Sequence, residues 1–177
     1  MGNPQGKIDE NRISRLAGFL DGEGCFDLQH QYQKHLRRES WRPRIRVSST
    51  DIPTLDRVTE ILDRLSVAYH VSWRYPTKAK WSKSWAVETT GFKRAQEYLT
   101  RITPYLFTKR AQAERLIDFI NSRMSGKANG HDPYTDAEVS LIMAIRSAVS
   151  GKGPSVKHPD MVLSSKPSQT HTLAQPD

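Results

Sequence analysis

A segment of nine residues, residues 16–24, constrains the fold of this chain most. It reads Leu-Ala-Gly-Phe-Leu-Asp-Gly-Glu-Gly, so a helix of apolar and small residues is expected to end there and pass at once into a strand. Small residues let a second backbone approach the helix, and Gly22 and Gly24 allow a sharp exit that a Cβ would resist. Glu23 therefore lies at a helix end. Two such helices packed about a two-fold axis would pair two carboxylates, as a hard divalent cation such as Mg²⁺ requires.

The length and charge of the chain limit its function. Its 177 residues are enough for one globular domain with its own core. The net charge of +8 implies a polyanionic partner, nucleic acid first and a membrane surface second. No apolar run is long enough to span a bilayer, and no signal-peptide core is present. The single cysteine, Cys25, excludes a disulfide framework and a multi-cysteine zinc site. We therefore expect an intracellular protein that does not bind membranes.

Hydrophobic periodicity predicts the elements of the fold. Asp9 is a good N-cap for the first helix, with Ile8 and Ile13 placed to form a hydrophobic staple. From Cys25 the apolar period changes to two, which is typical of a half-buried strand. The elements expected after the first helix are a strand at 25–33, a strand at 42–48, a helix capped by Thr50–Asp51 that reaches Leu65, strands at 67–75 and 81–90, and helices at 92–101, 105–124 and 135–149.

This order, αββαββα with two further C-terminal helices, predicts an α+β domain. One antiparallel sheet would have its inner face covered by helices and its outer face exposed. We divide the chain into an N-terminal extension (1–8), a domain (9–150) and a C-terminal tail (151–177). The tail is rich in Ser, Pro, Lys and Gln without periodicity, so we expect it to be disordered.

The outer face of the first predicted hairpin has the chemistry of a DNA-binding surface. Residues 34–46 carry six Lys or Arg and one Glu, a local charge of +5. Arg pairs with guanine and Gln with adenine in the major groove, which also admits a two-stranded ribbon. An ordinary solvated face would mix both signs of charge. The DNA contacts expected from this hairpin are Asp27, Gln29, Gln31, Gln33, Lys34, Arg37, Arg38, Arg42, Arg44 and Arg46.

A second hairpin is expected to extend the same face. His70, Ser72 and Arg74 would point outward from its first strand, and Ser84, Ala86 and Glu88 from its second. Trp73, Trp81 and Trp85 would then be available to the core, although a slip of one residue would exchange the two faces. Basic loop residues would contact phosphates. The DNA contacts expected here are His70, Ser72, Arg74, Lys78, Lys80, Lys83 and Ser84.

Residues 16–24 also resemble the motif that names the LAGLIDADG homing endonucleases: Leu-Ala-Gly, two apolar residues, Asp-Gly, an acid and Gly. No second segment of this kind occurs, so the resemblance is to single-motif members, which act as homodimers. It spans about residues 9–149 and implies the αββαββα homing-endonuclease fold and a long, pseudo-palindromic site in double-stranded DNA. It further implies Mg²⁺-dependent hydrolysis that leaves 3′ overhangs and promotes intron or intein mobility.

The resemblance assigns roles to individual residues. Glu23, where the family most often has Asp, would bind Mg²⁺ together with the Gly22 carbonyl, and Mn²⁺ or Ca²⁺ could substitute for binding. Lys109 falls where relatives carry a basic residue near the cleaved phosphate, although a solvated helix lysine is an alternative. Ser49 falls where relatives often have a water-orienting Gln, but Ser is shorter and a helix-capping role competes. The expected dimer interface is Leu16, Ala17, Gly18, Leu20 and Asp21, with Asp21 also stabilising the helix end.

Two other functions remain open at this point. The first is a non-cleaving nucleic-acid-binding protein of the same fold, such as an RNA maturase or a transcription factor. Relatives that lose cleavage often lose the acid, whereas Glu23 is present. The second is a basic scaffold for acidic membranes or proteins, which would leave residues 16–24 unexplained. Related proteins occur in organelles, bacteria and archaea, so the compartment is either an organelle (chloroplast or mitochondrion) or the prokaryotic cytoplasm.

Overall fold

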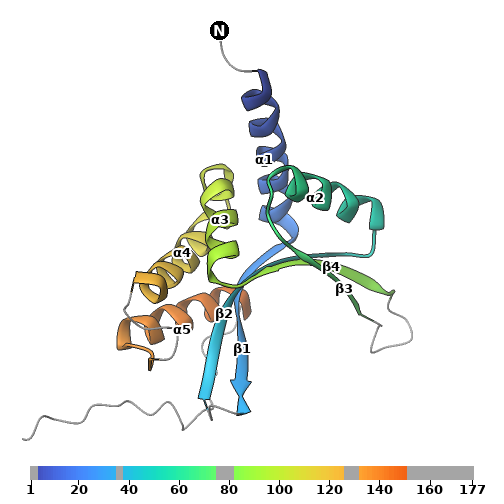
Figure 1. The fold of residues 1–177 in the computed structure, drawn as a ribbon. Coiled ribbons are helices and arrows are strands. Elements are labelled where there is room, and N and C mark those ends of the chain that lie inside the picture. The colour runs from blue at the N-terminus through green and yellow to red at the C-terminus, as the bar shows by residue number, and fades with distance from the viewer. Residues whose placement is uncertain (1–3, 35–37, 75–81, 126–131, 151–177) are drawn as a thin grey trace, which may run out of the picture.

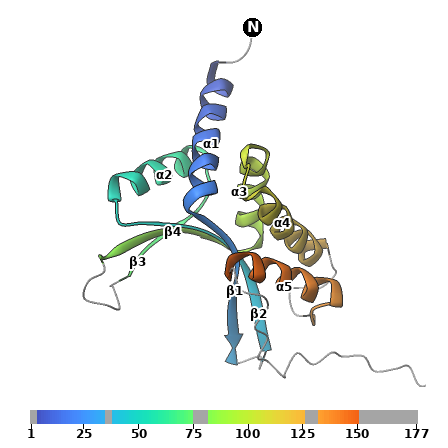
Figure 2. The same ribbon diagram turned by 180° about the vertical axis from the view of Figure 1, so that it is seen from behind.

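The computed structural model describes residues 4–34, 38–74, 82–125 and 132–150. It contains a four-stranded antiparallel sheet of order β1-β2-β4-β3 with helices on one face (Figures 1 and 2). The predicted α+β fold, αββαββα with two additional C-terminal helices, is confirmed. The elements are α1 (Pro4–Glu23), β1 (Gly24–Gln33), β2 (Arg38–Ser49), α2 (Ile52–Arg64), β3 (His70–Arg74), β4 (Ser84–Thr90), α3 (Phe92–Ile102), the 3₁₀ helix η2 (Thr103–Tyr105), α4 (Arg110–Ser125) and α5 (Asp136–Ser150).

The first helix begins earlier than its sequence suggests. It starts at Pro4, so Asp9 lies inside it and the predicted N-cap at Asp9 is wrong. Proline suits the first turn of a helix, where its missing N–H would have no partner, and nothing between Pro4 and Asp9 interrupts the helix. α1 therefore extends well beyond the body of the molecule in Figure 1.

The second hairpin and the fourth helix are shorter than predicted. β3 and β4 span five and seven residues, and the predicted strand ends at 75 and 81 lie outside the described residues. The helix predicted over 105–124 begins only at Arg110, after the short η2 helix that contains Pro104. The tail predicted at 151–177 also lies outside the described residues.

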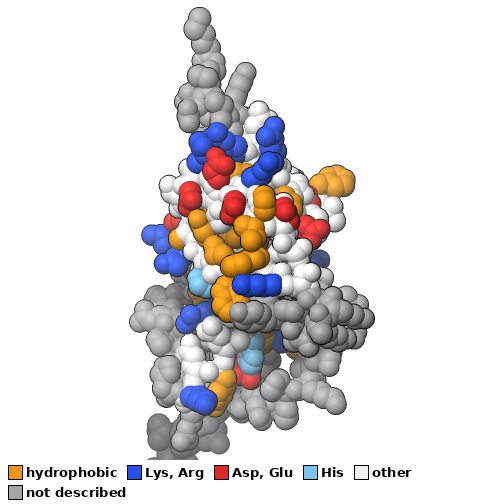
Figure 3. All heavy atoms as spheres, turned by 90° about the vertical axis from the view of Figure 1, so that its right-hand side faces the viewer, with side chains coloured by type: hydrophobic (Ala, Val, Ile, Leu, Met, Phe, Trp, Pro, Cys, Tyr) orange, Lys and Arg blue, Asp and Glu red, His pale blue; other side chains and the backbone are white. Residues whose placement is uncertain are grey.

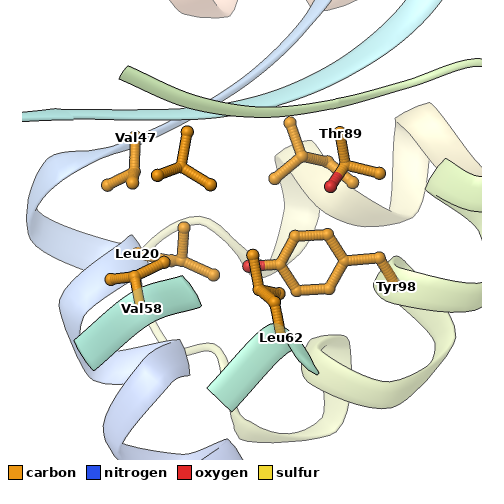
Figure 4. Close-up of a pocket in the computed structure, with 8 residues that line it drawn as sticks. Leu20, Val47, Val58, Leu62, Thr89 and Tyr98 are labelled. Carbon is orange, nitrogen blue, oxygen red and sulfur yellow. The ribbon is translucent and has the colours of Figure 1, made fainter. Parts of the chain in front are cut away.

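The hydrophobic core lies between the inner face of the sheet and the helices. Figure 4 shows α1, α2 and α3 contributing Leu20, Val58, Leu62 and Tyr98 below the strand residues Val47 and Thr89. These side chains enclose a cavity of about 10 Å³, enough for about one water molecule. Burial raises the pKa of Tyr98 well above its ordinary value, so its hydroxyl stays protonated even where an exposed tyrosine would ionise.

The pairing between β2 and β4 ends next to Pro43. β2 pairs with β1 from Arg38 to Val47 but with β4 only from Arg44 onward. The Gly91 N–H donates to the Pro43 carbonyl at 3.1 Å, so the missing N–H of Pro43 faces the point where β4 has already ended. Gly91 has a φ of 94°, which favours glycine, and turns the chain into α3. Farther along the same edge, the Trp41 N–H donates to the Tyr134 hydroxyl at 2.8 Å.

Candidate active site and outer sheet face

The junction of α1 and β1 forms the centre of the candidate site. β1 starts so close to the last turn of α1 that a Cβ on Gly24 would lie 2.6 Å from the Leu20 carbonyl oxygen. Only glycine fits there, as the sequence predicted for a sharp exit. Glu23 is the last residue of α1 and is exposed. The prediction of an acidic residue at the end of this helix is confirmed.

Lys109 reaches the same junction from a distant part of the chain. Its ammonium donates to the carbonyl oxygens of Leu20 and Gly22 at 3.1 Å and of Gly24 at 2.5 Å. Carbonyls at the end of a helix lack partners within the helix and favour a positive charge. The structure therefore fixes Lys109 at the α1 end, and the alternative of a solvated helix lysine is wrong.

Asp21 fixes the backbone that carries Lys109. Its carboxylate accepts the N–H of Phe107 at 2.7 Å and the N–H of Lys109 at 2.8 Å. These contacts hold the segment before α4 in a non-helical conformation, which explains why the helix predicted from residue 105 starts at Arg110. The role predicted for Asp21, at the end of its own helix, is corrected: it anchors a segment that no local pattern connects to it.

Ser49 takes part in the turn into α2. Its hydroxyl oxygen accepts the N–H of Asp51 at 3.0 Å, and the Asp51 carboxylate accepts the N–H of Thr54 at 3.0 Å. Asp51 is therefore the N-cap, and Ser49 stabilises the turn before it. The helix-capping role that the sequence left open for Ser49 is therefore taken by Asp51, and Ser49 has a structural role in the turn before the helix.

The exposed face of α1 carries two glycines in the last two turns of the helix. Leu16, Ala17 and Leu20 are at most 1% exposed and belong to the core of the single chain, so they offer little surface to a second copy, and the predicted dimer interface stays a prediction. Gly18 and Gly22 are exposed, and a Cβ on either would meet no atom within 4 Å. A second backbone therefore has access to α1 at these two positions.

The strand register groups the predicted outer-face residues as expected. Asp27 lies opposite Arg44, and Gln29 lies opposite Arg42. In the second hairpin the predicted register is also confirmed: Trp73 lies opposite Trp85, on the face opposite to the outward residues. The residues paired on the outer face of β3 and β4 are His70 with Glu88, Ser72 with Ala86, and Arg74 with Ser84.

Two arginines on this face are paired with acids. Arg44 donates to the Asp27 carboxylate through Nε at 2.8 Å and Nη2 at 2.6 Å, which raises the pKa of the arginine. Arg46 Nε lies 3.0 Å from Ser48 Oγ and 3.2 Å from Glu88 Oε1. The expectation of one dominant sign of charge is therefore corrected at the centre of the sheet, where acids and arginines alternate.

The remaining predicted contacts have varied positions. Lys34 and Arg42 are exposed, Gln29 and Gln31 are half-buried, and Gln33 donates to the Ser40 hydroxyl at 3.3 Å. The residues outside the described part of the chain are Arg37, Lys78 and Lys80, together with the side chains of Arg38 and Arg74.

Lys83 is directed away from the outer face. Its ammonium lies 4.6 Å from the ring centre of Trp73 and 4.5 Å from that of Trp85, both on the helix side of the sheet. Figure 3, viewed from the side of α2 and the β3–β4 hairpin, shows hydrophobic side chains gathered in this region. Lys83 therefore lies on the helix side of the sheet, and its expected contact with a DNA phosphate stays a prediction.

The oxygen atoms at the α1 end suit a hard divalent cation in part. Glu23 offers an exposed carboxylate, and the Gly22 carbonyl keeps a second lone pair beside the one that accepts from Lys109. Within the described ranges, no three His, Cys, Asp or Glu side chains form a metal-binding group. A single chain thus supplies part of an oxygen ligand set. No described helix is long and apolar enough to cross a membrane.

Comparisons with known proteins agree with this architecture. The homing endonuclease I-CvuI in complex with its target has a TM-score of 0.64 at 22% identity, over 82% of this chain and 87% of that one. The archaeal intron-encoded homing endonuclease I-Vdi141I, complexed with DNA, has a TM-score of 0.58 at 14% identity, over 78% and 84%. The group I intron-encoded homing endonuclease I-CeuI, complexed with DNA, has a TM-score of 0.55 at 14% identity, over 81% and 70%.

The TM-scores show that these proteins share the fold of this chain, and at identities of 14–22% they show no more than the fold. No curated protein sequence matches the chain. A family model described as a LAGLIDADG-like domain matches residues 10–103, which include the α1–β1 junction, Ser49 and the whole sheet. This match covers more than half of the sequence, and the chain therefore belongs to the LAGLIDADG family.

Proposed function

We propose that this protein is a site-specific DNA homing endonuclease that acts as a homodimer on a long pseudo-palindromic site. It hydrolyses phosphodiester bonds with Mg²⁺, leaves 3′ overhangs, and promotes the mobility of an intron or intein. The observation that carries this proposal is the Lys109 ammonium bound to the carbonyls at the α1 end, where the exposed acid Glu23 also lies, next to a sheet face that carries Arg42, Arg44 and Arg46.

Recognition of DNA would use the outer face of the sheet. Glutamines from β1 and arginines from β2 form adjacent rows there, with Gln29 opposite Arg42 as one example. These side chains match the hydrogen-bonding edges of adenine and guanine, and a ribbon of strands fits the major groove. Exposed cations such as Lys34 would contact phosphates and supply affinity that falls as the salt concentration rises.

Catalysis would use the groups at the α1 end. Mg²⁺, when bound by Glu23 and the Gly22 carbonyl, supplies a Lewis acid that activates water and neutralises negative charge. The Lys109 ammonium, held by three backbone carbonyls, keeps a positive charge next to the phosphate as negative charge develops there. Asp21 keeps the Lys109 backbone in place, so the cation is positioned before DNA binds.

A second copy of the chain would complete the site. Each copy contributes one Glu23, so two copies are needed for a pair of carboxylates. The open glycine face at Gly18 and Gly22 supports close packing of one α1 helix on another, because no atom of the same chain occupies that space. We propose that the dimer forms through this face.

The first experiment tests cleavage directly. Duplexes selected from a random library are cloned into a plasmid, and the protein with Mg²⁺ should linearise that plasmid and leave 3′ overhangs. Glu23→Gln should bind the selected site without cutting it, because the amide is a poor ligand for Mg²⁺. Glu10→Gln, an exposed acid near the other end of α1, is the matched control and should cut like the wild type.

A non-cleaving nucleic-acid-binding function is the second candidate. It is favoured by one observation: the Ser49 hydroxyl oxygen accepts the Asp51 N–H, which holds this short side chain in the turn before α2 and leaves one O–H and one lone pair for a water molecule. Tight binding of the selected duplex without cleavage at any Mg²⁺ or Mn²⁺ concentration would favour this function. Assisted folding of an intron RNA would then identify a maturase, and its absence a transcription factor.

A further inference from the structure

Arg44 is clamped on the outer face by Asp27. The two residues lie directly opposite each other on β2 and β1. Arg44 Nε donates to one carboxylate oxygen at 2.8 Å and Nη2 donates to the other at 2.6 Å. Their side chains are only 18% and 14% exposed, so water competes weakly for these charged hydrogen bonds. The guanidinium is therefore held in one orientation before any ligand binds.

This clamp uses one side of the guanidinium and leaves its end available. An arginine has five N–H donors, and Asp27 takes the Nε–H and one N–H of Nη2. One N–H on each terminal nitrogen still points along the end of the side chain. This pair of donors is the fork that contacts the O6 and N7 atoms of guanine in the major groove.

We infer that Asp27 is a positioning residue for DNA sequence recognition: it orients Arg44 so that the free end of the guanidinium reads a guanine. The inference rests on the proposed function. It adds that the base recognised at this position is guanine and that Asp27 controls this preference. A side chain that is already ordered loses little conformational entropy on binding. The Asp27 carboxylate also repels phosphates, so Arg44 is kept for a base edge rather than for the DNA backbone.

The neighbouring pair on the same face differs and serves as an internal comparison. Arg46 Nε is shared between Ser48 Oγ at 3.0 Å and Glu88 Oε1 at 3.2 Å, on β2 and β4. The acid that pairs with Arg46 is thus on β4, whereas the acid that pairs with Arg44 is on β1. A change at Glu88 should therefore alter recognition mainly at another base position, and should change the Arg44 position less than Asp27→Asn does, because Glu88 acts on Arg44 only through its charge.

The experiment is selection of duplexes from a random library, with Ca²⁺ present, by the wild type, Asp27→Asn, Arg44→Ala, the double variant Asp27→Asn/Arg44→Ala, and Glu88→Gln. The wild type should enrich a guanine at one position of each half-site. Asp27→Asn preserves shape but removes the charge, and should lower that guanine preference by about tenfold. Arg44→Ala should abolish it, and the double variant should match Arg44→Ala because Asp27 acts through Arg44.

The outcomes separate this inference from the proposed function. An enriched site whose guanine preference is unchanged in Asp27→Asn overturns the inference and leaves DNA recognition standing. A double variant that differs from Arg44→Ala also overturns it, because Asp27 would then contact a base itself. A wild type that enriches no site overturns both proposals.

Asp27→Glu tests whether the position of the carboxylate matters in addition to its charge. It keeps the negative charge but displaces the carboxylate, so the guanine preference should again fall. Full retention of the preference in Asp27→Glu would show that charge alone is sufficient, and would overturn a positioning role. Thermal unfolding of every variant is measured first, and binding to non-specific DNA should be unchanged or stronger in Asp27→Asn because a negative charge is removed.

Discussion

The Asp21 carboxylate accepts the backbone N–H of Lys109 at 2.8 Å, while the ammonium of the same lysine reaches back to the carbonyls at the end of α1. The end of the first helix and the residue before α4 are thus connected twice, once through an acid on α1 and once through the lysine. The orientation of Lys109 at the candidate site therefore depends on Asp21 as well as on its own hydrogen bonds.

Asp21→Asn should disturb both the stability of the chain and the position of Lys109. An amide keeps one acceptor oxygen but places an NH₂ group against the second N–H. We expect the free energy of unfolding, measured in urea, to fall by about 1–3 kcal/mol. Cleavage of a selected site should fall more than its binding. Asp56→Asn, at an exposed position of α2, is the control and should leave both measurements unchanged. Wild-type cleavage by Asp21→Asn would show that Lys109 is positioned without it.

Gly24→Ala should destabilise the fold. The added methyl would lie 2.6 Å from the Leu20 carbonyl oxygen and 2.8 Å from Leu20 Cδ2, so helix and strand must move apart. Overpacking of this kind costs about 1–3 kcal/mol, measurable by chemical unfolding. An unchanged midpoint would mean that the junction relaxes without cost.

Gly18→Ala should have opposite effects on the chain and on the proposed dimer. Within one chain nothing lies within 4 Å of the new methyl, and alanine in a helix interior is favoured over glycine by about 0.5–1 kcal/mol. If the α1 helices pack against each other at this residue, the methyl separates them and weakens association. Sedimentation equilibrium over a range of protein concentrations measures the effect. Association as strong as that of the wild type would place the dimer contact elsewhere.

Arg123→Ala should be strongly destabilising because Glu138 would lose its cation. Glu138 is 3% exposed, lies 3.4 Å from Arg123, and accepts hydrogen bonds from Ser122 and from the Thr135 N–H. Removal of one partner of a buried ion pair costs about 3–5 kcal/mol.

Arg110→Ala provides the matched control for this loss of a cation. Arg110 pairs with Glu114 on the surface, where the two side chains are 56% and 52% exposed. The expected cost is below about 1 kcal/mol. Equal losses of stability in Arg110→Ala and Arg123→Ala would contradict the assignment of Glu138 as a buried acid that needs Arg123.

Cys25 should react slowly with iodoacetamide. Burial raises the pKa of its thiol, and the Asp27 charge raises it further, whereas Arg44, Lys109 and Arg46 partly oppose these effects. The reactive thiolate is therefore scarce below the ordinary cysteine pKa, and alkylation should speed up only at higher pH than in the urea-unfolded chain. Arg44→Ala removes an opposing charge and should slow alkylation further. A folded protein that reacts faster than the unfolded chain would contradict this.

The sequence predicted the features that depend on local periodicity. The alternation from Phe26 onward placed Asp27 on the outer face because one face of the sheet is buried, which leaves only one register compatible with the core. It could not show that Asp27 lies directly opposite Arg44, because the alignment of two strands depends on the loop between them.

Contacts between distant segments also lay beyond sequence reasoning. No periodic pattern relates Asp21 to the start of α4, so the helix boundary at Arg110 could not be placed. Likewise, Leu16 and Leu20 read equally as interface or core residues, and only the packing of α1 against the other helices and the sheet decides between them. The stacking of Lys83 on tryptophan depended on the same kind of tertiary information.

The hydroxyl of Tyr134 occupies the position on the β2 edge where another protein's strand would otherwise add its backbone. A polyanion that gathers many copies of a basic protein brings their exposed strand edges close together, and a side chain from another element satisfies this edge in advance. The β1–β2 hairpin therefore interacts with other molecules through its side chains, and pairing of this strand edge with a second copy is disfavoured.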